Sequence, residues 1–147
     1  MTNFVKKTVL ALALAAGSAA GAQSVSANFG VSTANFNFGT TAANVGVTVQ
    51  NLTDLGGFPI DARVTADIGR STAINVDALI NYETSGLLLY AGPDVNYAFN
   101  SGSGIGVGLV AGINLPVFNQ FGAFAELQYS FLNGRGLVSR IGLSYQF

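Results

Sequence analysis

Hydrophobic and polar residues alternate along most of this chain with a period of two, which is the pattern of β-strands with one buried face. Stretches rich in glycine, asparagine and serine separate the alternating segments and favour turns. The six clear segments are residues 58–69, 72–82, 87–99, 104–114, 121–131 and 135–147. A break is expected at residues 115–120, around Pro116. The pattern predicts an all-β chain of antiparallel hairpins.

The first part of the chain alternates less regularly. Alternation holds from Val25 to Val31 and continues, shifted by one position, from Ala34 to Phe38. Such a shift needs a bulge or a turn near residues 32–34. Alternation returns at residues 43–49. Residues 23–57 therefore predict two further strands, which gives eight in total.

The two faces of the predicted strands differ sharply in charge. One face consists mainly of Ile, Val, Leu and Ala and carries no charge. The opposite face carries Asp61, Arg63, Asp67, Asp77, Asp94, Glu126 and Arg140 among polar residues and glycines. Aromatic residues lie near the ends of the apolar face, at Phe58, Tyr82, Tyr97, Phe121, Tyr129, Phe131, Tyr145 and Phe147. An uncharged face with aromatic borders is typical of a lipid-facing band with aromatic girdles, so the charged face is expected to point inward.

The composition supports a membrane protein rather than a soluble one. Charged residues make up 9% of the chain, whereas a soluble domain usually carries ~25–35% on its surface. After residue 22 no apolar stretch is long enough for a spanning helix, which leaves a β-barrel. Both lysines lie before residue 8, so the rest of the chain has no basic surface and nucleic acid is not an expected partner.

The N-terminus has the pattern of a secretory signal peptide. Lys6 and Lys7 precede an apolar run at residues 8–16, and Ala20-Gly21-Ala22 forms a cleavage site of small residues. We expect cleavage after Ala22, with residues 1–22 as signal peptide and residues 23–147 as a single barrel domain.

The last segment, residues 137–147, alternates strictly and ends on an aromatic residue. Its outward residues near the end are Ile141, Leu143, Tyr145 and Phe147. This segment resembles the closing strand of bacterial outer-membrane β-barrels, and the chain as a whole resembles small barrels of the OmpA/OmpX type. The resemblance implies an eight-stranded antiparallel up-and-down transmembrane barrel in the bacterial outer membrane, with periplasmic termini. It also implies two partners, the outer-membrane lipid and the barrel-assembly machinery that reads the closing strand, and it favours a monomer.

Hairpin geometry places two acids opposite two arginines on the inward face. With residues 69–71 as a three-residue turn, paired residues sum to 140, so Arg63 faces Asp77. With residues 132–134 as the last loop the sum is 266, so Glu126 faces Arg140. These pairs could form a charged constriction for ions or small solutes. We favour a packed interior, because an eight-stranded barrel has room for little more than its side chains, and Leu88, Tyr90 and Phe124 also point inward.

The other inward acids, Asp61, Asp67 and Asp94, have no arginine opposite them. We expect them at solvated rims of the barrel. Asp61 and Asp67 are six positions apart on one strand, roughly 20 Å at ~3.3 Å per residue, which is too far for a shared metal ion. No metal site or cofactor is predicted.

The chain offers little for catalysis. Residues 106–111 match the G-x-G-x-x-A dinucleotide pattern, but they continue an alternating strand and Pro116 leaves no room for the required helix. The chain contains no histidine or cysteine, and the enzymatic outer-membrane barrel families depend on histidine. We therefore predict a non-enzymatic barrel with a structural role in envelope integrity and a filled lumen. The alternatives are a narrow passive pore and a soluble, lipocalin-like binding barrel of the periplasm.

Overall fold

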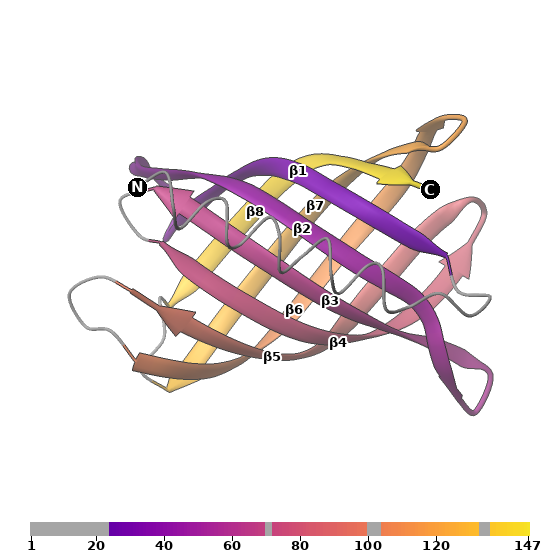
Figure 1. Cartoon of the computed structure of the whole chain (residues 1–147), viewed down its shortest axis with the longest axis horizontal. Helices are drawn as coiled ribbons and strands as arrows, with labels where there is room; N and C mark the ends of the chain where they lie inside the picture. Colours follow the sequence, from indigo (N-terminus) through magenta and orange to yellow (C-terminus); the bar gives the residue numbers. More distant parts are fainter. Residues whose placement is uncertain (1–23, 70–71, 100–103, 133–135) are drawn as a thin grey trace.

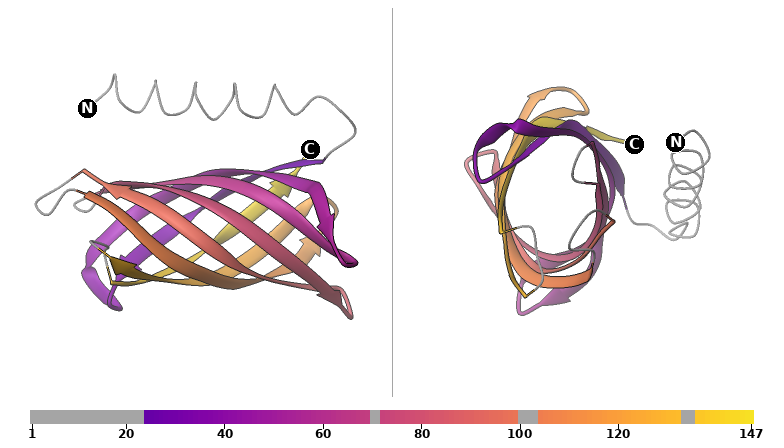
Figure 2. Two further views of the ribbon diagram at one scale, coloured as in Figure 1. Left: turned by 90° about the horizontal axis from the view of Figure 1, so that it is seen from below. Right: turned by 90° about the vertical axis from the view of Figure 1, so that its left-hand side faces the viewer.

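The computed structural model describes residues 24–69, 72–99, 104–132 and 136–147, so the predicted signal peptide lies outside the described residues. They form eight strands: β1 (Val25–Ala34), β2 (Asn37–Leu55), β3 (Phe58–Gly69), β4 (Ala73–Thr84), β5 (Leu87–Ala98), β6 (Gly104–Phe118), β7 (Phe121–Leu132) and β8 (Leu137–Gln146). Each strand pairs antiparallel with the next, and β8 closes on β1 (Figures 1 and 2). The predicted all-β fold and its eight strands are confirmed. The described residues contain no helix that is long and apolar enough to cross a membrane.

We call the end of the barrel where β1 begins and β8 finishes the terminal end, and we call the opposite end the far end. At the terminal end, on the right in Figure 1, β1 begins beside the last residues of β8, and tight turns join β2 to β3, β4 to β5 and β6 to β7. At the far end β1 turns into β2 through Asn35 and Phe36, and residues 70–72, 99–103 and 133–136 make the other connections. Every connection at the far end is short.

Three of the turns are two-residue hairpins with both central residues at positive φ. The central pairs are Asn35-Phe36, Gly56-Gly57 and Ser85-Gly86. This geometry is that of type I′ turns, whose twist matches that of the flanking strands. The register shift between Ser32 and Ala34, followed directly by the first turn, confirms the predicted irregularity.

One predicted boundary is wrong. Residues 115–118 are not a break but continue β6, and Pro116 pairs with Gly122 of β7. On its other side β6 is paired with β5 only as far as Asn114. A proline cannot donate to a ladder, so it is tolerated where a strand has a neighbour on one side only.

The faces of the strands divide as the alternation predicted. Outward Val, Ile and Leu residues are exposed, for example Val76, Leu109 and Ile141 at 52%, 53% and 61%. Aromatic side chains border this apolar band in two groups: Phe58, Tyr82, Phe121, Tyr145 and Phe147 at the terminal end, and Tyr97, Phe99, Tyr129 and Phe131 at the far end. Neighbouring rings touch, with centroids 4.9 Å apart in both Phe121–Tyr145 and Tyr97–Phe99. The inward face holds the polar residues described next.

Candidate functional site

The lumen of the barrel is polar and densely filled over half its length. All seven inward charged residues predicted from the sequence are buried, with at most 4% of each exposed. Five of them are carboxylates and two are arginines, so the described lumen is negatively charged. Burying unpaired charges is costly, so the partners of each group determine whether this interior is stable.

Glu126 joins the two arginines near the middle of the barrel. Arg63 on β3 donates to Asp77 at 2.7 Å and to Glu126 at 2.5 Å. Arg140 on β8 donates to the other oxygen of Glu126 at 2.7 Å. The hydroxyl of Tyr90 also donates to Glu126, at 3.0 Å. The structure thus places Arg63 opposite Asp77 and Glu126 opposite Arg140, as the two hairpin sums predicted, and adds a contact between the pairs.

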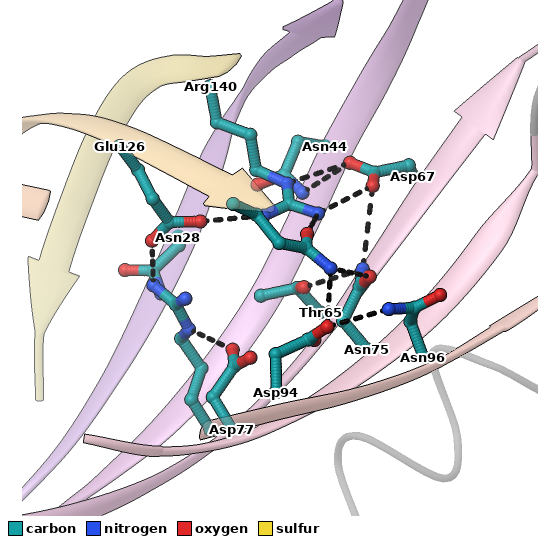
Figure 3. Close-up of polar contacts among 12 residues, drawn as sticks. Asn28, Asn44, Thr65, Asp67, Asn75, Asp77, Asp94, Asn96, Glu126 and Arg140 are labelled. Carbon is teal, nitrogen blue, oxygen red and sulfur yellow. Dashed lines mark hydrogen bonds and ion pairs between the residues drawn. The ribbon is translucent and has the colours of Figure 1, made fainter. Parts of the chain in front are cut away.

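Arg140 also crosses the lumen to Asp67. Its Nε and Nη2 donate to the two oxygens of Asp67 at 3.2 and 2.8 Å, and Nη2 donates to the side-chain oxygen of Gln128 as well. The amide of Gln128 then donates to Asp94 at 2.6 Å and to Asn75 at 3.2 Å. Figure 3 shows how these side chains from separate strands converge on one another. Such charge-assisted bonds are stronger than neutral ones.

Amide side chains extend this network around the wall. Asn44 donates to Asp67 at 2.8 Å, Asn75 donates to Thr65 at 3.1 Å, and Asn96 donates to Asp94 at 2.6 Å. We call the following residues, each at most 2% exposed, the plug: Asn44, Thr65, Asp67, Asn75, Asp94, Asn96, Gln128 and Arg140. Ser32 of β1 and Val110 of β6 are as deeply buried, so every strand contributes to the filled section. The plug occupies the half of the lumen toward the far end.

The expected solvated rims are wrong for all three acids. Asp67 and Asp94 have no exposed surface and belong to the plug. Asp61 is 4% exposed and accepts a hydrogen bond from the backbone N–H of Asn51 at 2.9 Å. Asn51 has positive φ and lies in a register shift between Val49 and Thr53, which brings its amide toward the lumen.

The half of the lumen toward the terminal end contains a cavity instead. This cavity, which we call the vestibule, has a volume of about 580 Å³ and includes Asp61, Asn81 and Asn114 in its lining. A smaller pocket of about 30 Å³ continues inward and is lined by Arg63, Tyr90 and Phe124 among others. Six residues line both spaces: Ser26, Gln50, Asp61, Asn81, Leu88 and Asn114. The vestibule therefore narrows toward the layer around Arg63.

Glycines make room for the large inward side chains. A Cβ on Gly112 would lie 2.5 Å from the ring of Tyr90. One on Gly142 would lie 2.8 Å from Phe124 and 2.2 Å from the carbonyl oxygen of Phe29. Gly106 and Gly108 lie in strand β6. The residues that match the dinucleotide pattern therefore do not precede a helix, as that motif requires. In the described part of the chain no cluster of three or more acids is arranged to hold a metal ion.

Comparisons with known proteins agree with this architecture. No protein-family model matches the sequence, and no curated protein is detectably similar in sequence. The Yersinia pestis outer membrane protein Ail, solved in a phospholipid bilayer nanodisc, superposes with a TM-score of 0.60 at 13% identity, over 85% of this chain and 99% of Ail. The designed protein TMB2.3 superposes with a TM-score of 0.61 at 17% identity, over 85% and 94% of the two chains. Another designed transmembrane barrel gives 0.57 at 15% identity, over 84% and 95%. This chain therefore has the fold of the small eight-stranded transmembrane β-barrels, the architecture of outer-membrane proteins such as Ail.

Proposed function

We propose that this protein is a non-enzymatic barrel of the bacterial outer membrane that contributes to envelope integrity and does not conduct solutes. The observation that carries the proposal is the plug. Its charged and amide side chains come from six strands, are bonded to one another across the lumen, and expose at most 2% of their surface. A solute would have to break several charge-assisted hydrogen bonds to pass.

The outward face supports a location in lipid. Its apolar residues are exposed along the strands and are bordered at both ends by aromatic rings, which favours a lipid bilayer around the barrel. We propose that residues 1–22 direct export and that the terminal end faces the periplasm. The outward residues of the closing strand, Ile141, Leu143, Tyr145 and Phe147, are proposed to guide recognition by the barrel-assembly machinery, with the folded barrel as a monomer.

A narrow passive pore is the second candidate function. The observation that favours it is the vestibule, which is open at the terminal end and is bordered by the acids Asp61 and Glu83. If the plug opened, a negatively charged lumen would select cations over anions.

Conductance across a planar bilayer separates the two candidates. The refolded protein is expected to give no stable single-channel steps. A variant with Gln128→Ala and Arg140→Ala removes two of the largest plug side chains and is expected to give cation-selective steps. Asn114→Ala, on the vestibule wall, is the matched control and should stay silent. Reproducible steps from the unchanged protein would contradict the closed-lumen proposal.

A soluble periplasmic barrel is tested separately. A membrane barrel should need detergent or lipid to stay in solution and should migrate differently in gels before and after heating. Full solubility without detergent would contradict the membrane location itself.

A further inference from the structure

The vestibule has the size and position of a ligand site. Small-molecule sites usually enclose about 300–1,000 Å³, and the vestibule has about 580 Å³. It is open at the terminal end and ends blindly at the layer that contains Arg63 and Tyr90. A molecule can therefore enter from one side without passing the plug.

Arg63, which lines the inner pocket, has one hydrogen-bond donor without a partner. Arg63 uses Nε for Asp77 and Nη1 for Glu126, but Nη2 is buried and has no partner among the described residues. Its side chain is 4% exposed and lines the inner pocket. The inner pocket, at about 30 Å³, is large enough for at least one water molecule. A hydroxyl group of a ligand therefore fits there.

The charges of the lining favour an uncharged ligand. The carboxylates of Asp61 and Glu83 border the vestibule, and among its lining residues none is positively charged. An anion would be repelled on its way in, and at the inner end it would meet Glu126 and Asp77 beside Arg63. A cation would meet the guanidinium of Arg63 at that same end. Neither sign of charge is accommodated along the full depth of the cavity.

The neutral lining residues match hydroxyl groups. Gln50, Asn81 and Asn114 contribute side-chain amides, and Ser26 and Ser144 contribute hydroxyls. Each of these groups can both donate and accept, whereas the carboxylate of Asp61 only accepts. A ligand with several hydroxyls can serve all of them, because every hydroxyl is itself both donor and acceptor.

We infer that the vestibule is a binding site for a small uncharged polyhydroxylated molecule, such as a monosaccharide or disaccharide. One hydroxyl occupies the inner pocket and accepts from Nη2 of Arg63, while others bond to Asp61 and the amides of the wall. This inference goes beyond the proposed structural role and does not depend on whether the lumen conducts.

The test is NMR of the isotope-labelled protein in lipid nanodiscs, titrated separately with D-glucose, sucrose, sodium phosphate and tetramethylammonium chloride. A sugar is expected to shift the side-chain signals of Arg63, Gln50 and Asn114 saturably in the millimolar range. Asn114→Leu should weaken binding roughly fivefold to tenfold, because it removes one hydrogen-bonding group from the wall. Asn37→Leu, at the exposed far end of β2, is the matched control and should bind like the unchanged protein.

Several outcomes would overturn the inference. Larger shifts with phosphate would indicate an anion site at Arg63, and larger shifts with tetramethylammonium would indicate a cation site at Asp61. Absence of saturable shifts with both sugars would mean that the vestibule holds only water. Equal weakening by Asn114→Leu and Asn37→Leu would place binding elsewhere. If Asn114→Leu does not fold, Gln50→Ala tests the same wall, and unchanged sugar affinity there would also contradict the proposal.

Discussion

The two halves of the lumen are built from the same eight strands but differ in what their inward residues do. In the far half, long side chains such as Arg140 and Gln128 meet across the lumen and leave almost no exposed surface. In the terminal half, small inward residues such as Ser26, Gly122 and Ser144 leave a cavity of about 580 Å³. The number of strands is the same in both halves, so side-chain size and pairing determine which half is filled. We expect the far half to dominate stability and the terminal half to tolerate change.

The largest effect is expected from Arg140→Ala in the plug. The substitution removes the guanidinium that pairs with Asp67 and with Glu126. It also leaves a cavity, because the side chain of Arg140 is buried, with 2% of the residue exposed. Breaking a buried ion pair by removing one partner costs about 3–5 kcal/mol. The free energy of unfolding, from reversible urea titrations in lipid vesicles, should fall by that amount.

A double-mutant cycle with Asp67→Asn isolates the pair across the lumen. Arg140→Ala with Asp67→Asn should lose less stability than the sum of the two single changes, because no unpaired carboxylate remains at that position. Asp67 is a cleaner partner for this cycle than Glu126, since Glu126 also binds Arg63. Strictly additive losses would contradict a coupled pair and weaken the contrast between the halves.

The same substitution at one asparagine in each half makes the contrast direct. Asn75 is fully buried and bonds to Thr65, Asp67 and Gln128. Asn114 is half-buried on the vestibule wall and donates to Ser144 at 2.9 Å. Asn75→Ala should cost roughly 2–3 kcal/mol, because buried partners are left unsatisfied, and Asn114→Ala should cost roughly 1 kcal/mol or less, because water can replace the bond. Equal losses in the same urea titrations would show that the halves do not differ in this way.

Pairing between neighbouring strands was predictable, because turn length fixes the register. The residue sums gave Arg63 opposite Asp77 and Glu126 opposite Arg140, and both are present. Contacts across the lumen were not predictable in this way. Asp67 on β3 meets Arg140 on β8 although β1 and β2 lie between these strands. Such contacts depend on the tilt and stagger of the whole barrel, which no single hairpin determines.

The sequence contained enough information to predict that the amide residues of the plug point inward. Asn44, Asn75 and Gln128 lie on the same inward face as the charges, and the alternation places them there. Alternation shows which face of a strand a residue lies on, but not its height along the barrel axis. For this reason Asp67 and Asp94 were expected at the rims. The vestibule could not be predicted for the same reason, since its volume depends on which small residues lie at the same height.

The boundary between the halves is expected to be sensitive to added volume. A Cβ on Gly112 would lie 2.5 Å from the ring of Tyr90, which closes the inner end of the vestibule. Gly112→Ala should therefore cost about 1–2 kcal/mol through overpacking, measured by the same unfolding titrations. Tyr90→Leu in the same chain should recover part of the loss by removing the clashing ring atoms. Gly39→Ala, on an exposed part of β2, is the control and should change stability little; a similar loss there would contradict overpacking as the cause.

The smallest effect is expected at the rim of the terminal half. Ser85 has a φ of 50° and precedes Gly86 at 78°, so this pair forms the two-residue turn between β4 and β5. Asparagine adopts positive φ more readily than serine, and Asn-Gly is the preferred pair for a type I′ turn. Ser85→Asn should therefore raise the free energy of unfolding by roughly 0.5 kcal/mol. The side chain of residue 85 is exposed, so no packing change should offset the gain. This turn borders the vestibule and not the plug. A much larger increase in the free energy of unfolding would mean that the terminal half limits the stability of the barrel. That result would be the reverse of what the buried plug predicts.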